Sequence, residues 1–125
     1  MENKNIAASG YRNFNFVEVK EGKTLGQCVS SIEDIINHTK KTEHRNILLD
    51  ASNAIRADNE TKALYRIYSH AKKRDVNLSL LACEHTRYST LGDGLSKIPV
   101  YCSVELYHQA LNSIYFPATP QSRLK

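Results

Sequence analysis

Residues 45–74 read RNILLDASNAIRADNETKALYRIYSHAKKR, and this stretch decides the class of fold. Its first part, residues 45–50, contains an unbroken apolar run, as expected for a strand buried on both faces of a parallel sheet. Its last part has the spacing of an amphipathic helix, with an apolar stripe formed by Ala63, Leu64, Ile67, Tyr68 and Ala71. A strand that leads into a helix through a short polar segment is the repeating unit of α/β proteins.

The same order of strand and helix precedes this stretch. Residues 13–19 (NFNFVEV) alternate between apolar and polar side chains, which predicts a strand. The helix that follows has Thr24 as its N-cap, and Gln27 three residues later completes a capping box. Its apolar stripe consists of Leu25, Cys28, Val29, Ile32, Ile35 and Ile36.

The pattern continues after the central stretch. Residues 76–84 predict another buried strand, and the following segment predicts a short helix that is broken near its glycines. Residues 98–102 predict a last short strand, where Pro99 indicates the edge of the sheet because proline cannot donate to a ladder. Ser103 is expected to cap a final helix.

We therefore predict a single α/β domain with a four- to five-stranded, mainly parallel or mixed sheet and about four helices, mostly on one face. The domain is expected to span residues 13–116, with a C-terminal tail at 117–125. Residues 1–12 are expected to form a flexible tail or an edge strand. A homodimer through an exposed edge at residues 13–19 is a further expectation, because edge strands offer unpaired backbone groups.

Composition and charge exclude several classes of protein. The 125 residues include no apolar run long enough to span a membrane, and the polar start has no secretory signal, so we expect a cytoplasmic location. The net charge of +4 comes from scattered basic residues without interleaved aromatics, so no nucleic-acid partner is predicted. Three cysteines in no zinc-binding spacing, and no paired histidines, predict neither metal nor cofactor.

Catalytic motifs are also missing from the sequence. Neither glycine-rich phosphate loop, G-x-G-x-x-G or G-x-x-x-x-G-K-[ST], occurs, and there is no G-x-S-x-G nucleophile elbow. Asp50 and Glu84 end neighbouring predicted strands, where the sites of α/β enzymes gather. Two acids without a nucleophile or metal motif make a weak active site, so we predict that the chain is not an enzyme.

The polar segment after residue 50 is the best candidate site. It opens at the carboxyl edge of the sheet, and the helix that follows presents unsatisfied N–H groups and partial positive charge at its start. Such a place favours a phosphate, either in a ligand or on a phosphorylated side chain, and Ser52 and Thr61 are the hydroxyls available. The alternative is that Ser52, Asn53, Asp58 and Asn59 only form turns and caps.

The ordered features of this chain resemble a STAS domain, the fold of anti-sigma factor antagonists. The similar features are NILLDASNA, a helix that ends in the basic AKKR, the next strand and short helix, and the closing IPVYCSVELYHQAL. Upstream, VEVKEGKTLGQC is similar to the family's entry into its first helix, so the resemblance covers roughly residues 13–115. It implies a sheet covered by helices and a role in bacterial signalling and transcription regulation.

The family's phosphorylation motif, D-S-[ST]-G-[LIV], lies at the start of the second helix, and a partner kinase that is itself an anti-sigma factor phosphorylates its second hydroxyl. Asp58 matches the motif's aspartate, but Asn59 and Glu60 stand in place of the two hydroxyls and Thr61 in place of the glycine. The resemblance therefore implies a partner-binding loop whose phosphorylation switch is altered. Glu60 would be a permanent substitute for a phosphorylated residue.

The predicted function is thus that of a non-catalytic regulatory protein that binds a protein partner, such as an anti-sigma factor kinase or another signalling protein. The partner-binding loop is expected to comprise Ser52, Asn53, Asp58, Asn59, Glu60 and Thr61. The alternative is a module that binds a small molecule or lipid, as STAS-like relatives imply. Its apolar pocket would be lined by Phe14, Phe16, Tyr65, Tyr68 and Tyr88.

Overall fold

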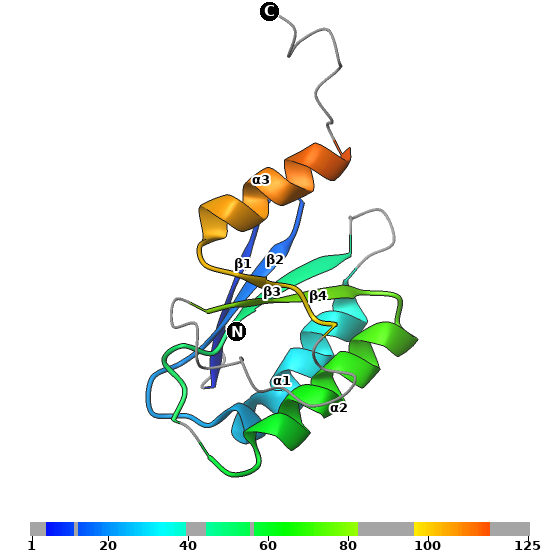
Figure 1. Cartoon of the computed structure of the whole chain (residues 1–125). Coiled ribbons are helices and arrows are strands. Elements are labelled where there is room, and N and C mark those ends of the chain that lie inside the picture. Colours follow the sequence, from blue (N-terminus) through cyan, green and yellow to red (C-terminus); the bar gives the residue numbers. More distant parts are fainter. Residues whose placement is uncertain (1–4, 12, 40–44, 56, 83–96, 116–125) are drawn as a thin grey trace, which may run out of the picture.

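The computed structural model describes residues 5–11, 13–39, 45–55, 57–82 and 97–115 (Figure 1). The elements in chain order are β1 (Ile6–Gly10), β2 (Asn15–Val19), α1 (Leu25–His38), β3 (Asn46–Asp50), α2 (Glu60–Lys73), β4 (Asn77–Leu81), β5 (Val100–Tyr101) and α3 (Val104–Tyr115). The predicted short helix between β4 and β5 and the predicted C-terminal tail lie outside the described residues.

The five strands form one sheet in the order β1-β2-β3-β4-β5. Strand β1 is antiparallel to β2, whereas β2, β3, β4 and β5 are parallel to their neighbours. Each parallel connection that the structure describes carries a helix, as crossovers between parallel strands require. The predicted α/β class with a mainly parallel, mixed sheet is therefore confirmed.

Helices α1 and α2 cover one face of the sheet, and α3 lies on the other (Figure 1). The side chains of β3 show why both faces are apolar. Ile47 and Leu49 belong to the large core under α1 and α2, and Leu48 belongs to a smaller core under α3. All three are fully buried, which explains the unbroken apolar run in the sequence.

The described helices begin largely as the sequence indicates. The Thr24 hydroxyl accepts a hydrogen bond from the Gln27 backbone N–H, and the Gln27 side chain accepts one from the Thr24 N–H, so the predicted capping box is present. The Ser103 hydroxyl accepts a hydrogen bond from the Leu106 N–H at the start of α3. No helix within the described residues is long and apolar enough to cross a membrane.

One expectation about the sheet edge is wrong. Segment 13–19 contains β2, and β2 is paired on both sides because Ile6–Gly10 forms β1 beside it. The sequence leaves two alternatives for residues 1–12, a flexible tail or an edge strand, and Ile6–Gly10 within them forms the strand β1. An edge-to-edge dimer would therefore use β1, whose residues after Ile6 are exposed.

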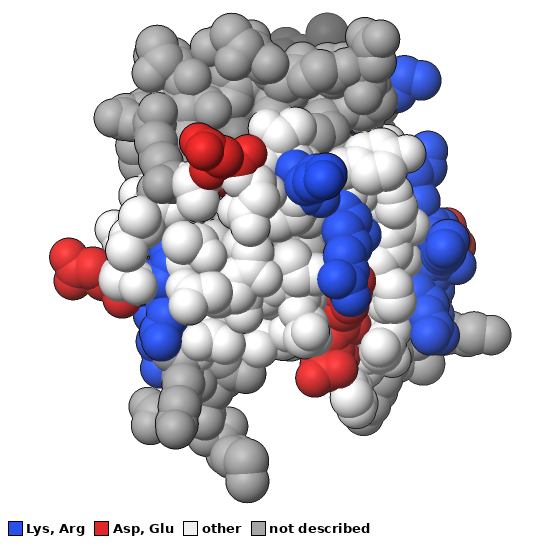
Figure 2. All heavy atoms as spheres, turned by 90° about the horizontal axis from the view of Figure 1, so that it is seen from below, with Lys and Arg blue, Asp and Glu red and all other residues white. Residues whose placement is uncertain are grey.

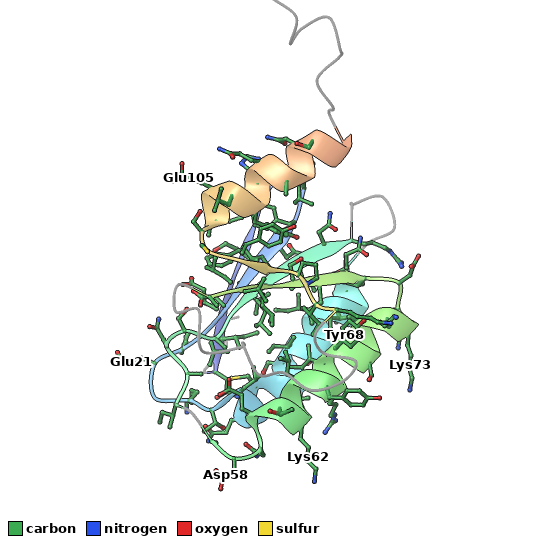
Figure 3. All side chains as sticks on the ribbon, viewed as in Figure 1. Glu21, Asp58, Lys62, Tyr68, Lys73 and Glu105 are labelled. Carbon is green, nitrogen blue, oxygen red and sulfur yellow. The ribbon has the colours of Figure 1, made fainter. Side chains whose placement is uncertain are left out.

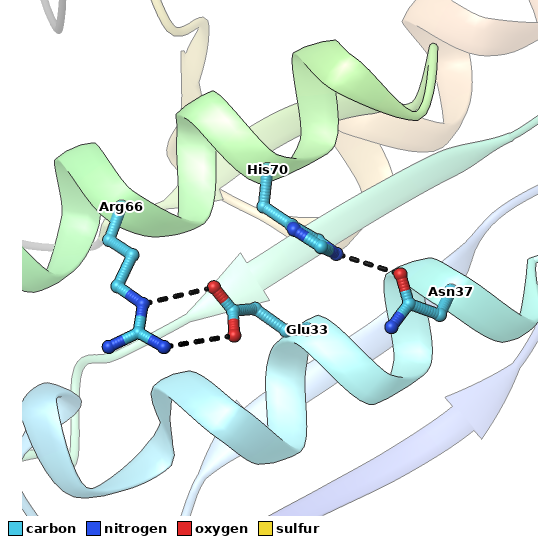
Figure 4. Close-up of polar contacts among 4 residues, drawn as sticks. All are labelled: Glu33, Asn37, Arg66 and His70. Atoms are coloured by element: carbon cyan, nitrogen blue, oxygen red, sulfur yellow. Dashed lines mark hydrogen bonds and ion pairs between the residues drawn. The ribbon is translucent and has the colours of Figure 1, made fainter.

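On their outer surface, α1 and α2 are joined by polar contacts (Figure 4). The Arg66 guanidinium donates to both carboxylate oxygens of Glu33, at 3.1 and 3.4 Å, and a His70 ring nitrogen lies 2.7 Å from the Asn37 amide oxygen. Figure 2 shows that charges of both signs are interspersed over the described part of this face. The outer helix surface is thus a solvated face, and the polar loops at the sheet edges are better candidates for a site.

Candidate functional site

The candidate site is the segment from Asp50 to Thr61, which joins the carboxyl end of β3 to the first turn of α2. It starts with a local turn in which the Asp50 carboxylate accepts hydrogen bonds from the Ser52 backbone N–H, at 2.9 Å, and from the Ser52 hydroxyl. Ala51 is fully buried, and its carbonyl accepts a bond from the Ala54 N–H at 3.0 Å. Asp50 therefore acts as a turn-forming side chain here.

The middle of the segment is tied to the chain that precedes α1. Ile55 forms a parallel bridge with Thr24, and its N–H donates to the Lys23 carbonyl at 2.8 Å. The Ile55 side chain nevertheless remains about half exposed. The loops that follow β2 and β3 are thus joined at one edge of the sheet, so the starts of α1 and α2 are held side by side.

A close contact between Asn59 and Gly26 strengthens this link. A Cβ atom added to Gly26 would lie 3.0 Å from the Asn59 amide nitrogen, so glycine leaves the room that the Asn59 side chain occupies. Asn59 is the N-cap residue of α2, but its side chain makes no capping hydrogen bond. The asparagine that the sequence indicates as a cap instead packs against the first turn of α1.

The remaining residues of the predicted loop present polar groups at the start of α2. Ser52, Asn53, Asp58, Asn59 and Thr61 are exposed, and Glu60 is half-buried in the first helical turn. Figure 3 shows the Asp58 side chain pointing away from the body of the molecule. The structure therefore brings all six predicted loop residues to one edge of the sheet, on a segment that is anchored at both ends.

The polar groups at the start of α2 are suited to binding a partner molecule. The partial positive charge at the start of α2 interacts favourably with the Glu60 carboxylate. The two hydroxyls differ, because the Ser52 hydroxyl is already bonded to Asp50, whereas the Thr61 side chain is exposed. Within the described part of the chain, no group of three or more His, Cys, Asp or Glu side chains is placed to hold a metal ion.

The proposed acid pair of an enzyme is not assembled by the described residues. Asp50 pairs in register with Leu81 of β4 and is engaged in its own turn. Its predicted partner, Glu84, lies outside the described residues.

The expected aromatic pocket is not formed as predicted. Phe14 and Phe16 pack in the core under α3, whereas Tyr68 packs against the core under α2, on the opposite face of the sheet. Tyr65 is more than half exposed on α2, and Tyr88 lies outside the described residues. Alternation along β2 and the helical spacing on α2 predict burial, but neither pattern states which face of the sheet receives each aromatic ring.

Sequence reasoning missed two features around the sheet edges. The first is the Gly26–Asn59 contact, for which the only sequence signal is a glycine in the first turn of the predicted helix. The second is a hollow beside β4, lined in part by Tyr68, Lys72, Lys97 and Tyr101. No local sequence pattern predicts this hollow, because the residues that line it come from four separate segments of the chain.

The sheet order, the two layers of helices and the loop at the start of α2 together define a STAS-like fold, as the sequence resemblance predicts. A similar solved structure is that of RsbS from Moorella thermoacetica, in a variant that carries glutamate in place of a serine. The two chains are 18% identical and superpose with a TM-score of 0.65, over 87% of this chain and 96% of that one. No protein-family model and no curated protein matches this sequence.

Proposed function

We propose that this chain is a non-catalytic, cytoplasmic regulatory protein that binds a protein partner through the loop at residues 52–60 and the first turn of α2. The observation that carries the proposal is the state of this loop. Ser52, Asn53, Asp58 and Asn59 are exposed, while the backbone of the loop is fastened to β3 at one end and to the start of α1 at the middle. A surface that is ordered before binding loses less conformational entropy when a partner docks.

The similarity to RsbS supports a regulatory role of this kind, since the two chains share their fold over most of their lengths. A fold does not dictate a function, so the proposal depends on the site. The site offers hydrogen-bonding groups and a helix N-terminus, and its Ser52 hydroxyl is engaged with the Asp50 carboxylate in a local turn. Binding is the activity that these groups support.

Glu60 is the residue that gives the proposal its mechanism. Its carboxylate lies in the first turn of α2, where a negative charge is stabilised by the helix dipole. In the resembling family this place carries a hydroxyl that becomes phosphorylated. We propose that the carboxylate holds the loop in one binding state, which makes partner affinity independent of a kinase.

The test is to replace Glu60 by serine and compare the partners captured from a lysate of the source organism. We expect Glu60→Ser to change the amount of the main captured protein, measured by quantitative mass spectrometry. The stability cost is expected to be small, about 0.3–1 kcal/mol for the lost dipole interaction. If the capture profile of Glu60→Ser is the same as that of the unmodified chain, the role of Glu60 is refuted.

Glu105→Ser is the matched control. Glu105 is also the acidic residue in the first turn of a helix, but it lies on α3, far from Asp58 and the loop (Figure 3). Both substitutions remove a carboxylate from the first turn of a helix, at a half-buried position for Glu60 and at an exposed position for Glu105. An effect on capture that is confined to Glu60→Ser would therefore come from the loop surface.

A further inference from the structure

A hollow of about 440 Å³ lies at the edge of β4, away from the partner-binding loop. It exists because β5 is only two residues long and pairs only with Leu80 and Leu81. The carbonyl of Pro99, which precedes β5, accepts a hydrogen bond from the Leu80 N–H at 2.8 Å, but Pro99 has no N–H to donate in return. The first half of β4 is therefore paired with β3 on one side, and on its other side the described residues leave a hollow.

The sheet contributes polar side chains to the wall of the hollow, next to the apolar Leu78. Asn46 and Ser79 line the hollow with exposed fractions of 4% and 6%. Asn77 donates from its side-chain amide to the Asn46 amide oxygen at 3.1 Å, and Asn46 donates to the Asn13 carbonyl at 3.0 Å. The Ser79 hydroxyl has no hydrogen-bond partner among the described residues, so it is available to a bound molecule.

Three tyrosines line the same hollow from different elements. Tyr68 comes from α2 on one face of the sheet, whereas Tyr101 of β5 and Tyr107 of α3 belong to the core on the other face, so the hollow passes around the outer edge of β4. The rings of Tyr101 and Tyr107 are 5.1 Å apart and meet edge to face. Figure 3 shows Tyr68 on the side of α2 that faces the sheet. Aromatic walls with a few convergent polar groups are typical of sites for small molecules, whose volumes begin at about 300 Å³.

The charge at the hollow has one sign. Lys72 and Lys97 both line it, and none of the described residues that line it is acidic. The Lys72 ammonium lies 5.5 Å from the centre of the Tyr68 ring, in a cation–π contact that leaves its other donors available. Two ammonium groups that line one hollow attract an anion, because a cleft lined by one sign of charge focuses the electric field.

We propose that this hollow binds a small organic anion, with its ring among Tyr68, Tyr101 and Tyr107 and its carboxylate or phosphate held by Lys72 and Lys97. The Ser79 hydroxyl and the Asn77 amide supply hydrogen bonds to polar groups on the ring. The site is independent of the loop at residues 52–60, which lies at the carboxyl edge of the sheet, whereas Asn46 and Asn77 begin their strands at the amino edge.

The proposal is tested by titrating the ¹⁵N-labelled chain with three probes: phenyl phosphate, benzoate and the neutral benzamide. We expect both anions, or one of them, to shift the backbone amide signals of Asn46, Ser79 and Tyr101 in a saturable way. Benzamide is expected to bind at least about tenfold more weakly, the factor that corresponds to about 1.4 kcal/mol of lost charge interaction. The tighter anion identifies the charged group that the site prefers.

Variants separate the hollow from general attraction to a positive protein. Lys72→Gln combined with Lys97→Gln should weaken anion binding at least about tenfold. Lys62→Gln combined with Lys73→Gln removes the same charge from exposed positions that do not line the hollow, and should leave affinity unchanged. Because all four lysines are exposed, both variants are expected to fold.

The proposal is overturned if no probe binds saturably, if benzamide binds as tightly as the anions, or if the shifted signals lie outside the hollow. It is also overturned if the two double variants lose affinity equally, since that result would mean attraction by net charge alone.

Discussion

Cys28 is a core residue whose thiol is expected to react slowly. It is fully buried on α1, and its thiol lies 3.3 Å from the Thr24 carbonyl and 3.5 Å from the Asn5 carbonyl. Burial raises the pKa of the Cys28 thiol above its ordinary value of 9.0, and nearby Lys23 only partly opposes this effect. The neutral thiol, which can donate to a carbonyl, is the form that the fold prefers.

We therefore predict that iodoacetamide at pH 8 modifies exposed Cys102 much faster than Cys28, because only the thiolate reacts. The raised pKa also makes folding more favourable below pH 9 and less favourable as the pH rises through the pKa of the folded thiol. Peptide mass spectrometry after timed labelling measures the two rates. Equal rates in the folded protein would contradict the assignment of Cys28 to the core.

At the scale of secondary-structure elements, α1 and α2 have the same length and begin in different ways. Helix α1 starts with a complete capping box, whereas the N-cap side chain of α2 makes no capping bond. The first turn of α2 is instead held by the segment before it, which bridges to Thr24. The start of α2 thus keeps its polar side chains on the surface, as a recognition site needs.

Substitution of the two N-cap residues should show this difference. Thr24→Ala is expected to lower the free energy of unfolding by about 1 kcal/mol, the usual cost of a lost cap. Asn59→Ala should cost less, because it removes packing against Gly26 and no capping hydrogen bond. Urea denaturation of the two variants measures both values. A larger loss for Asn59→Ala would mean that the contact with Gly26 matters more than the capping box.

At the scale of the whole molecule, the sheet separates two cores of unequal size. The core under α1 and α2 is extensive, whereas the core under α3 is built around Phe14, Leu48, Leu81, Tyr107 and Leu111. Leu111 also lines the hollow, so the smaller core has open space at its border. Truncation of a buried side chain is therefore expected to lower the free energy of unfolding by different amounts in the two layers.

We predict that Leu64→Ala, on α2, destabilises the protein more than Leu111→Ala, on α3. Both side chains are buried, and the loss for such substitutions lies between about 2 and 5 kcal/mol. The difference arises because a cavity under α2 is enclosed, whereas the surroundings of Leu111 can relax toward the hollow. Urea denaturation measures both changes. An equal loss of stability in the two variants would contradict the idea that the residues around Leu111 relax toward the hollow.

Much of the fold and part of the site could be predicted because their signals are local. The buried run of β3, the stripe of α1 and the box formed by Thr24 and Gln27 each depend on neighbours within a few residues. The same holds for the loop at residues 52–60, since a polar segment between a strand and a helix must emerge at the edge of a parallel sheet. In the structure these residues do lie together at that edge.

The pairing of distant segments is what only the tertiary structure decided. Whether β1 covers β2, which face α3 takes, and whether Phe14 and Tyr68 share a pocket depend on contacts between residues far apart in the chain. The hollow beside β4 depends on where β5 stops, and the packing of Asn59 depends on Gly26 of another helix. Periodicity determines which side chains are buried, whereas the partners of those side chains are set by how the packed layers fill space.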